Sequence, residues 1–298
     1  MIKYMKKIFI PVLCIGMSLF VLCGCSRERI ESQDELKSFA IAALNAGNYE
    51  DALSGFDEAL SLADGRVSAR ELDICYYKAV TQYLLEDVTG ACETLENVIA
   101  YDDKNSDAYY LRGSIYLSEG ETELGIADME RSVATDGDDR ERVIDVFNAL
   151  SGSGQREAGL SIVSQALSEL SDSREDILWR ARYHLVLEQY DEALSDLDQI
   201  EGGDTERLLI QGEKLMQDEQ YEAALGSFDE GLAFYDSDDD KGKKELSQET
   251  YRRLLSDRVA AYEFMGEWND ALKAAREYIA LYPQDARMLR EIKFLASR

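Results

Sequence analysis

A small residue recurs along the chain, and its four central occurrences are separated by 34 residues each. The whole series consists of Ala52, Ala91, Gly125, Gly159, Ala193, Ala224 and Ala271. The clearest members follow an aromatic residue at the start of an amphipathic segment, as Ala52 follows Tyr49 and Ala193 follows Tyr190. A fixed period of this length predicts repeated supersecondary units, each of which buries its hydrophobic face against its neighbours.

A second series of mostly small residues stands twelve positions ahead of the first. It consists of Ala40, Ala79, Gly113, Phe147, Ala181, Gly212 and Val259. Helices that interlock at about 8–10 Å need small side chains where they cross. The two series therefore predict antiparallel helix pairs that touch through alanine and glycine. Phe147 is the bulky exception, and we expect it to face Gly159, the partner with the most room.

The spacing and the turn sequences resemble the tetratricopeptide repeat family. Typical turns are Gly47-Asn48-Tyr49 and Gly266-Glu267-Trp268, each followed by a segment with a helical pattern. The resemblance implies an all-α fold, an α-α superhelix of about seven helix-turn-helix repeats with a C-terminal capping helix. Only two prolines occur in 298 residues, which agrees with long helices. The family's large residue in the second helix is matched by Phe56, Leu95, Met129, Val163, Leu197 and Phe228.

The N-terminus has the marks of an export signal. Three lysines within residues 1–7 precede an uncharged apolar run over residues 8–22. This run is shorter than the about 20 residues that cross a bilayer, and its pattern is typical of a signal peptide. It ends in Leu22-Cys23-Gly24-Cys25, which resembles the lipobox of bacterial lipoproteins. The resemblance implies that Cys25 becomes the lipidated N-terminus of the mature protein; an ordinary cleaved signal is the alternative.

These features together predict the organisation of the chain. We expect a signal peptide at residues 1–24, a lipidated N-terminus with a short tether at 25–32, and the repeat array at 33–298. The expected repeats cover residues 33–66, 72–105, 106–139, 140–173, 174–204, 205–238 and 252–285. Residues 286–298 form the expected cap, with Leu289, Ile292 and Leu295 on one helical face. The acidic insertion around residues 236–249 either extends a helix or forms a loop.

The sequence contains no recognisable catalytic or metal-binding constellation. His184 is the only histidine and takes the place of a tyrosine in the family pattern, so we expect it to be packed. Asp236, Asp238 and Asp240 have the spacing of a calcium loop, but Lys241 stands where such a loop needs glycine. The sequence therefore predicts no enzyme, no cofactor and no metal.

Two cysteines lie in the body of the chain, Cys75 and Cys92. A disulfide between them is conceivable outside the cytoplasm. Their positions are offset along the two helices of one expected hairpin, which is poor geometry for a bridge. We therefore expect two buried thiols.

The formal net charge of −28 restricts the partners of the chain. An acidic surface repels phosphate backbones and anionic headgroups, so it argues against nucleic-acid binding. It favours basic segments of a partner. We expect contact with a membrane only through the lipid anchor, and the sequence indicates no particular oligomeric state.

The resemblance also implies where a partner would bind, because first helices line the groove of tetratricopeptide arrays. The matching positions are Tyr76, Tyr83, Tyr110, Leu117, Leu178, Arg182 and Leu185, with Leu209, Glu213 and Met216 in the sixth repeat. The alternative is that about half of them pack against neighbouring helices. A row of acidic residues marks the rim of this groove at Asp34, Asp73, Asp107, Glu141, Glu175 and Glu206. Carboxylates near helix N-termini are also favourable by the helix dipole, which is a sufficient structural explanation.

An anchor joined to a repeat array predicts an extracytoplasmic scaffold on a cell membrane. Its expected activity is to bind a protein or peptide, with envelope or secretion-complex assembly as one variant. A solute- or glycan-binding surface lipoprotein is the alternative. Sugar sites usually stack their ligand on tryptophan, and only Trp179 and Trp268 are present.

Overall fold

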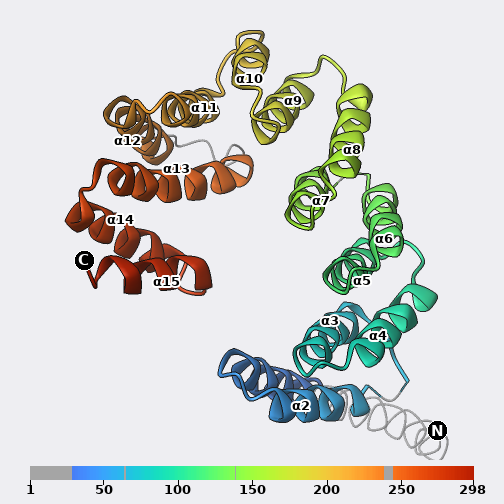
Figure 1. The fold of residues 1–298 in the computed structure, drawn as a ribbon. Coiled ribbons are helices and arrows are strands. Elements are labelled where there is room, and N and C mark those ends of the chain that lie inside the picture. Colours follow the sequence, from blue (N-terminus) through green and yellow to red (C-terminus); the bar gives the residue numbers. More distant parts are fainter. Residues whose placement is uncertain (1–28, 64, 138, 238–243) are drawn as a thin grey trace, which may run out of the picture. The chain divides into compact units, whose positions relative to one another are not determined.

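The computed structural model describes residues 29–63, 65–137, 139–237 and 244–298, and side chains within them except at 235–237 and 244–247. All regular elements of these residues are helices, as predicted (Figure 1). The first described helix covers residues 29–45. The others are α2 (Tyr49–Ser61), α3 (Ala69–Leu84), α4 (Val88–Tyr101), α5 (Ser106–Ser118), α6 (Thr122–Thr135), α7 (Glu141–Gly152), α8 (Arg156–Glu169), α9 (Arg174–Val186), α10 (Tyr190–Leu197), α11 (Asp204–Gln217), α12 (Tyr221–Ser237), α13 (Lys244–Met265), α14 (Trp268–Leu281) and α15 (Ala286–Leu295).

These helices form consecutive hairpins that follow the expected repeats. The helix over residues 29–45 pairs with α2, and the pairs α3–α4, α5–α6, α7–α8, α9–α10, α11–α12 and α13–α14 continue the series. The first helix already contains residues 29–32, which the sequence assigned to a tether. The insertion between the sixth and seventh repeats adds to the start of α13, beyond a stretch at 238–243 that lies outside the described residues. Cys25, Asp238, Asp240 and Lys241 also lie outside them, and the side chain of Asp236 is not described.

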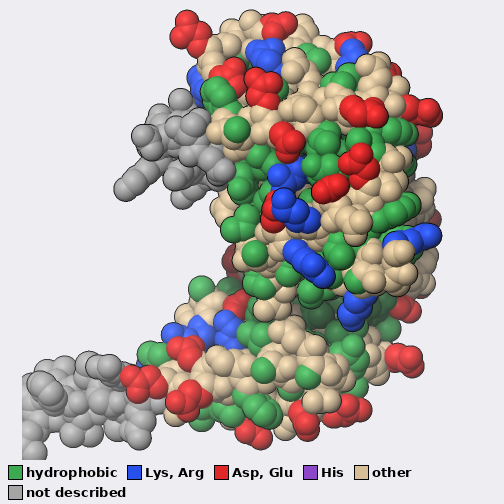
Figure 2. Space-filling model, turned by 90° about the vertical axis from the view of Figure 1, so that its left-hand side faces the viewer, with side chains coloured by type: hydrophobic (Ala, Val, Ile, Leu, Met, Phe, Trp, Pro, Cys, Tyr) green, Lys and Arg blue, Asp and Glu red, His purple; other side chains and the backbone are tan. Residues whose placement is uncertain are grey.

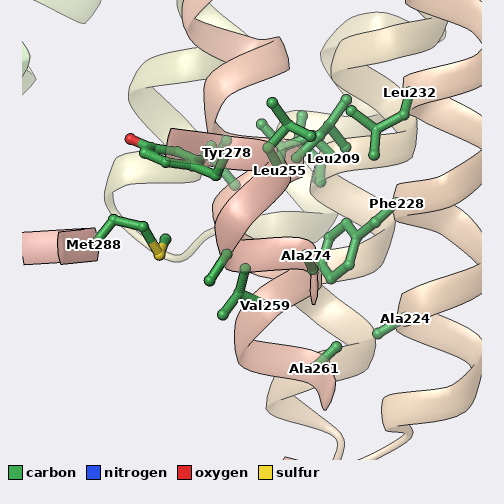
Figure 3. Packing of buried hydrophobic residues seen from close by; sticks show 14 of the residues in the cluster. Leu209, Ala224, Phe228, Leu232, Leu255, Val259, Ala261, Ala274, Tyr278 and Met288 are labelled. Carbon is green, nitrogen blue, oxygen red and sulfur yellow. The ribbon is translucent and has the colours of Figure 1, made fainter. Parts of the chain in front are cut away.

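The chain divides into two compact units, residues 1–162 and 163–298, which are described separately below. The first unit contains the hairpins up to α7. Its cores include one cluster around Phe56 and Ile74 and a second around Leu95 and Ile115. The second unit has one continuous core, in which Leu209 of α11, Phe228 of α12 and Leu255 of α13 converge (Figure 3).

The small residues mark the helix crossings, as the sequence predicted. Both series are buried throughout. A Cβ atom added to Gly113 would lie 3.1 Å from the Cβ of Asp128, and one added to Gly212 would overlap the ring of Phe228. Phe147 does face Gly159, where an added Cβ would lie 3.1 Å from its ring. The helix pairs therefore approach as closely as their side chains allow.

The large residues of the second helices fill the space beside these crossings. Phe56, Leu95, Met129, Val163, Leu197 and Phe228 are all fully buried. Burial of such a side chain stabilises a fold by roughly 1.5–3 kcal/mol relative to its exposed state. The two sequence patterns, small and large, therefore account for the interior of the six hairpins that contain both.

Each hairpin turns through a residue in the left-handed backbone region, two positions before its second helix. Glycine takes this place at Gly47, Gly120, Gly154 and Gly266, with φ between +76° and +82°. Glutamate takes it at Glu86, Glu188 and Glu219, with φ of 58–63°. The Ser-Gly-Ser-Gly segment before α8 thus makes the same turn as the other repeats.

The C-terminal helix α15 closes the second unit with a different face from the one predicted. Met288 and Leu295 are buried and Ile292 packs against the core, whereas Leu289 is 40% exposed. Asp285 caps the helix by accepting a hydrogen bond from the backbone N–H of Met288 at 3.0 Å. The expected cap is present, but Met288 replaces Leu289 as its contact with the core.

Candidate functional site

The first helices of the hairpins lie next to one another within each unit. In the first unit α5 contacts both α3 and α7, and in the second unit α11 contacts α13. We call these helices, with α15 as the last member, the first-helix row. The predicted groove and rim residues all belong to this row, so it is the candidate binding face of each unit.

In the first unit, the acidic rim residues form ion pairs with bases of the neighbouring first helix. Arg70 of α3 lies 2.7 Å from Asp34, and Lys37 reaches forward to Asp73. Arg142 of α7 pairs with Asp107 of α5. These acids therefore hold adjacent repeats together, a role that the sequence did not predict.

The same pairing occurs in the second unit. Arg182 of α9 lies 3.5 Å from Glu206 of α11 and donates a hydrogen bond to Thr250 of α13 at 3.1 Å. Its guanidinium also lies over the ring of Trp179.

The remaining rim acids, Glu141 and Glu175, stand in the first turns of α7 and α9, where the helix dipole favours a carboxylate. Acidic, basic and hydrophobic side chains are interspersed on the face drawn in Figure 2.

Two predicted groove tyrosines are half-buried and bound to their surroundings. The hydroxyl of Tyr76 donates a hydrogen bond to Asn105 at 2.8 Å, and Asn105 in turn caps α5. The ring of Tyr110 lies under the guanidinium of Arg142, 4.7 Å from its centre. Burial and nearby carboxylates raise the pKa of both tyrosines. Both keep a partly exposed surface beside a polar or basic group.

Four other predicted groove residues mainly serve packing. Leu178 and Leu185 are buried in the core of the second unit, so they are removed from the candidate surface. Leu117 packs onto Gly125, whose missing Cβ leaves room for it. Tyr83 is half-buried against the second core cluster of the first unit. In the first unit the candidate surface is thereby reduced to Tyr76 and Tyr110, joined by Arg142. In the second unit, where Leu209 is also buried and Met216 packs against the core, Arg182 remains.

The second unit contains acidic pairs that the sequence did not predict. Glu213 of α11 faces Asp257 of α13 and forms an ion pair with Arg253. Burial raises the pKa of Tyr190, which faces this group from α10, to about 12. The sequence placed Glu213 on the groove, but Asp257 becomes its neighbour only through the packing of α11 on α13. Nothing in the sequence distinguishes these two acids from the other charged residues of α11 and α13.

His184 is packed, as expected. Its Nδ1 lies 2.7 Å from Asp196, which also accepts a hydrogen bond from Arg180 at 2.8 Å. Arg112 and Asp128 form the equivalent pair between α5 and α6. The Arg112–Asp128 and Arg180–Asp196 ion pairs have the same separation along the chain, so they are repeated structural features of the hairpin.

Cys75 and Cys92 are free, partly buried thiols of the same core cluster. Burial raises the pKa of both, which disfavours the nucleophilic thiolate at neutral pH. Among the residues with described positions, no group of three or more His, Cys, Asp or Glu could hold a metal ion. A search of the same residues finds no helix with the length and apolar character needed to cross a membrane.

One stretch of the chain matches a known family. Residues 259–285, which cover the end of α13 and all of α14, match the tetratricopeptide repeat. No curated protein matches the chain.

Several solved structures with similar folds contain tetratricopeptide or TPR-like repeats. One from Parabacteroides merdae is 13% identical, with 89% of this chain and 99% of that chain covered and a TM-score of 0.47. A putative kinesin light chain of Podosopora anserina with TPR-like repeats is 18% identical, with 57% and 92% covered and a TM-score of 0.37. The TPR domain of P58(IPK) is 18% identical, with 88% and 77% covered and a TM-score of 0.30. The matched repeat and the hairpins that precede it support the tetratricopeptide repeat family for this array.

Proposed function

We propose that this chain is a lipid-anchored, extracytoplasmic scaffold whose helical array binds a protein or peptide and catalyses no reaction. Stacked hairpins build an extended surface, which is how repeat proteins engage partners. The observation that carries the proposal is the partly exposed pair of Tyr76 and Tyr110 on the first-helix row, with Arg142 over Tyr110. Tyrosine and arginine are the residue types that most often contribute binding energy at interfaces.

The anchor is proposed from the N-terminal sequence. Basic residues, a short apolar run and Leu22-Cys23-Gly24-Cys25 are together typical of a bacterial lipoprotein signal. Lipidation of Cys25 would hold the protein at a cell membrane through more than one acyl chain. Because the helical array already begins by residue 29, few residues separate the anchor from the fold.

The proposed partner is a protein with a basic segment. The net charge of −28 attracts such a segment and repels nucleic acid. Several rim acids are already paired with arginine or lysine, so the attraction comes from the whole surface more than from that row. Assembly of an envelope or secretion complex is a process in which a tethered scaffold of this kind would act.

A solute- or glycan-binding lipoprotein is the alternative function. Trp179 is buried, and it lies beneath Arg182. Trp268 is 37% exposed, but it packs edge-on against Phe294, and the guanidinium of Arg298 lies over its ring. Trp179 is thus removed from the surface and Trp268 is partly covered, so the protein-binding function is preferred.

The anchor is tested by changing Cys25→Ser in the native cells. We expect the variant to lose incorporation of a palmitate analogue and to leave the membrane fraction. Unchanged labelling and unchanged fractionation would contradict lipidation at this residue.

The binding face is tested by proximity labelling from the anchored protein. We expect one stoichiometric partner, whose recovery falls at least about tenfold when Tyr76 and Tyr110 are changed to alanine, a loss of about 1.4 kcal/mol. Tyr83 stays in place because, although Tyr76 packs against the same core cluster, Tyr76 also makes a polar contact with Asn105. The matched control is Tyr101→Ala, which removes a tyrosine that is 61% exposed on the second helix α4. Equal recovery from the double variant and the control would reject the first-helix row as the binding face.

A further inference from the structure

Two carboxyl pairs join neighbouring helices of the first-helix row in the second unit. Glu213 of α11 faces Asp257 of α13, and Glu263 of α13 faces Glu291 of α15, so that each carboxyl group lies within reach of the other. An ionised carboxylate has only acceptors, so a hydrogen bond between two carboxyl groups requires a proton on one of them. Each of the two joints therefore closes around a shared proton.

The surroundings supply too little positive charge to replace these protons. Arg253 of α13 forms an ion pair with Glu213. The positive charge of Arg287 on α15 lowers the pKa of both Asp257 and Glu263. Glu188, in the turn after α9, adds negative charge near Glu213. Tyr190 faces the first pair from α10 and stays neutral, with a pKa of about 12. The four carboxyl groups of the two pairs thus share two arginines.

Two carboxyl oxygens in these joints are buried without a hydrogen-bond donor among the described residues. They are Oδ2 of Asp257 and Oε1 of Glu263. A buried charged oxygen without a donor is costly, whereas a neutral carboxyl group tolerates the same position. The absence of donors to these two oxygens and the contacts between carboxyl groups therefore both indicate that one carboxyl group of each pair is protonated.

The protonated state has a defined pH range. Burial and the neighbouring carboxyl raise the pKa of Asp257 to about 8, and burial with Glu291 raises that of Glu263 to about 7. Burial also raises the pKa of Glu213. Because the folded values lie above the ordinary ones, the closed form binds protons that the open form releases. Stability from these joints is complete below about pH 4 and is lost as the pH rises towards 8.

We propose that the α11–α13–α15 joint is a proton-responsive element of the second unit. It is closed while each carboxyl pair holds a proton, and the helices separate more often once the protons leave. In the first unit the corresponding contacts join acids to bases, as in Asp34 with Arg70 and Asp107 with Arg142. The proposal does not depend on which partner the array binds.

Hydrogen–deuterium exchange of the full chain tests the proposal at pH 6.0 and pH 8.5, with exchange times corrected for the intrinsic rate. We expect opening of α11, α13 and α15 to increase at least about tenfold over this range, since each raised group contributes up to about tenfold per pH unit below its pKa. Protection of α3 and α5 should stay constant. The double variant Asp257→Asn, Glu263→Gln keeps the shape without ionisation and should abolish the increase.

Constant protection of α11, α13 and α15 in the native chain would overturn the proposal. The same increase in the double variant would also overturn it. If the double variant does not fold, carboxyl carbon NMR of the native chain decides the question. Titration of Asp257 and Glu263 above pH 6 supports the joint, and titration of both below pH 5 rejects it.

Discussion

The two units use the same packing but a different balance of charge between their repeats. Phe56 packs in the first unit as Phe228 does in the second, and both are fully buried. The first-helix contacts differ, because Asp107 contacts an arginine of the next repeat, whereas Glu213 contacts a second buried carboxyl group, Asp257, beside Arg253. The repeated hairpin therefore determines the hydrophobic interior of each repeat. The charged contacts with the next repeat can differ from one repeat to another.

The largest expected effect tests the shared packing. Changing Phe228→Ala removes the ring that packs onto Gly212, and Phe56→Ala removes its counterpart, which stacks on Tyr77 in the first core cluster. Each change should lower the free energy of unfolding by about 3–5 kcal/mol, because the cavity is only partly refilled. Denaturant unfolding followed by circular dichroism measures both losses. A much smaller loss in one unit would show that the two interiors are not equivalent.

An intermediate effect tests the difference in charge. Changing Arg253→Met leaves Glu213 and Asp257 without the guanidinium between α11 and α13. Removal of one partner from a largely buried group should cost about 2 kcal/mol, discounted because Arg253 is partly exposed. The loss should be larger at pH 8.5 than at pH 5.5, since at low pH the pair keeps its protons.

Arg142→Met is the matched change in the first unit. Its partner Asp107 is largely exposed, so the cost should be about 1 kcal/mol or less. The described ion pairs of Arg142 are with three separate carboxylates, those of Asp107, Asp139 and Asp145. The loss of stability should therefore be the same at pH 5.5 and pH 8.5. The same pH dependence in both variants would remove the distinction between the units.

The helix crossings could be predicted from the sequence because they depend on spacing within one hairpin. The approach of Phe147 to Gly159 follows from counting residues along two consecutive helices. The candidate surface was harder to predict. Leu178 and Leu185 hold groove positions in the repeat, but contacts with the next hairpins bury them in the core. A repeat frame gives the direction of a side chain and not what covers it.

The charged contacts could not be predicted for a related reason. The rim acids were visible as a row, but their bases come from the neighbouring repeat, as Arg70 does for Asp34. Asp257 reaches Glu213 only when α13 packs on α11. A protonated carboxyl pair has no sequence signature, because its energy depends on burial and on distances across the joint.

The smallest effect concerns the hairpin turns. Glu86, Glu188 and Glu219 adopt a left-handed conformation that costs a residue with a Cβ about 1–2 kcal/mol. Glycine removes this cost in the folded state, but its greater backbone freedom in the unfolded chain offsets part of the gain. Each change to glycine should therefore raise the free energy of unfolding by about 0.5 kcal/mol. Gly120→Ala is the control in the opposite direction, since its Cβ would enter open space and only the backbone would be strained.

The stabilisation by Glu188→Gly should exceed the stabilisation by Glu86→Gly above neutral pH, because the change at Glu188 also removes a carboxylate that raises the pKa of Glu213. Thermal unfolding at pH 8.5 measures the difference, and equal gains at the two turns would show that Glu188 has no influence on the joint.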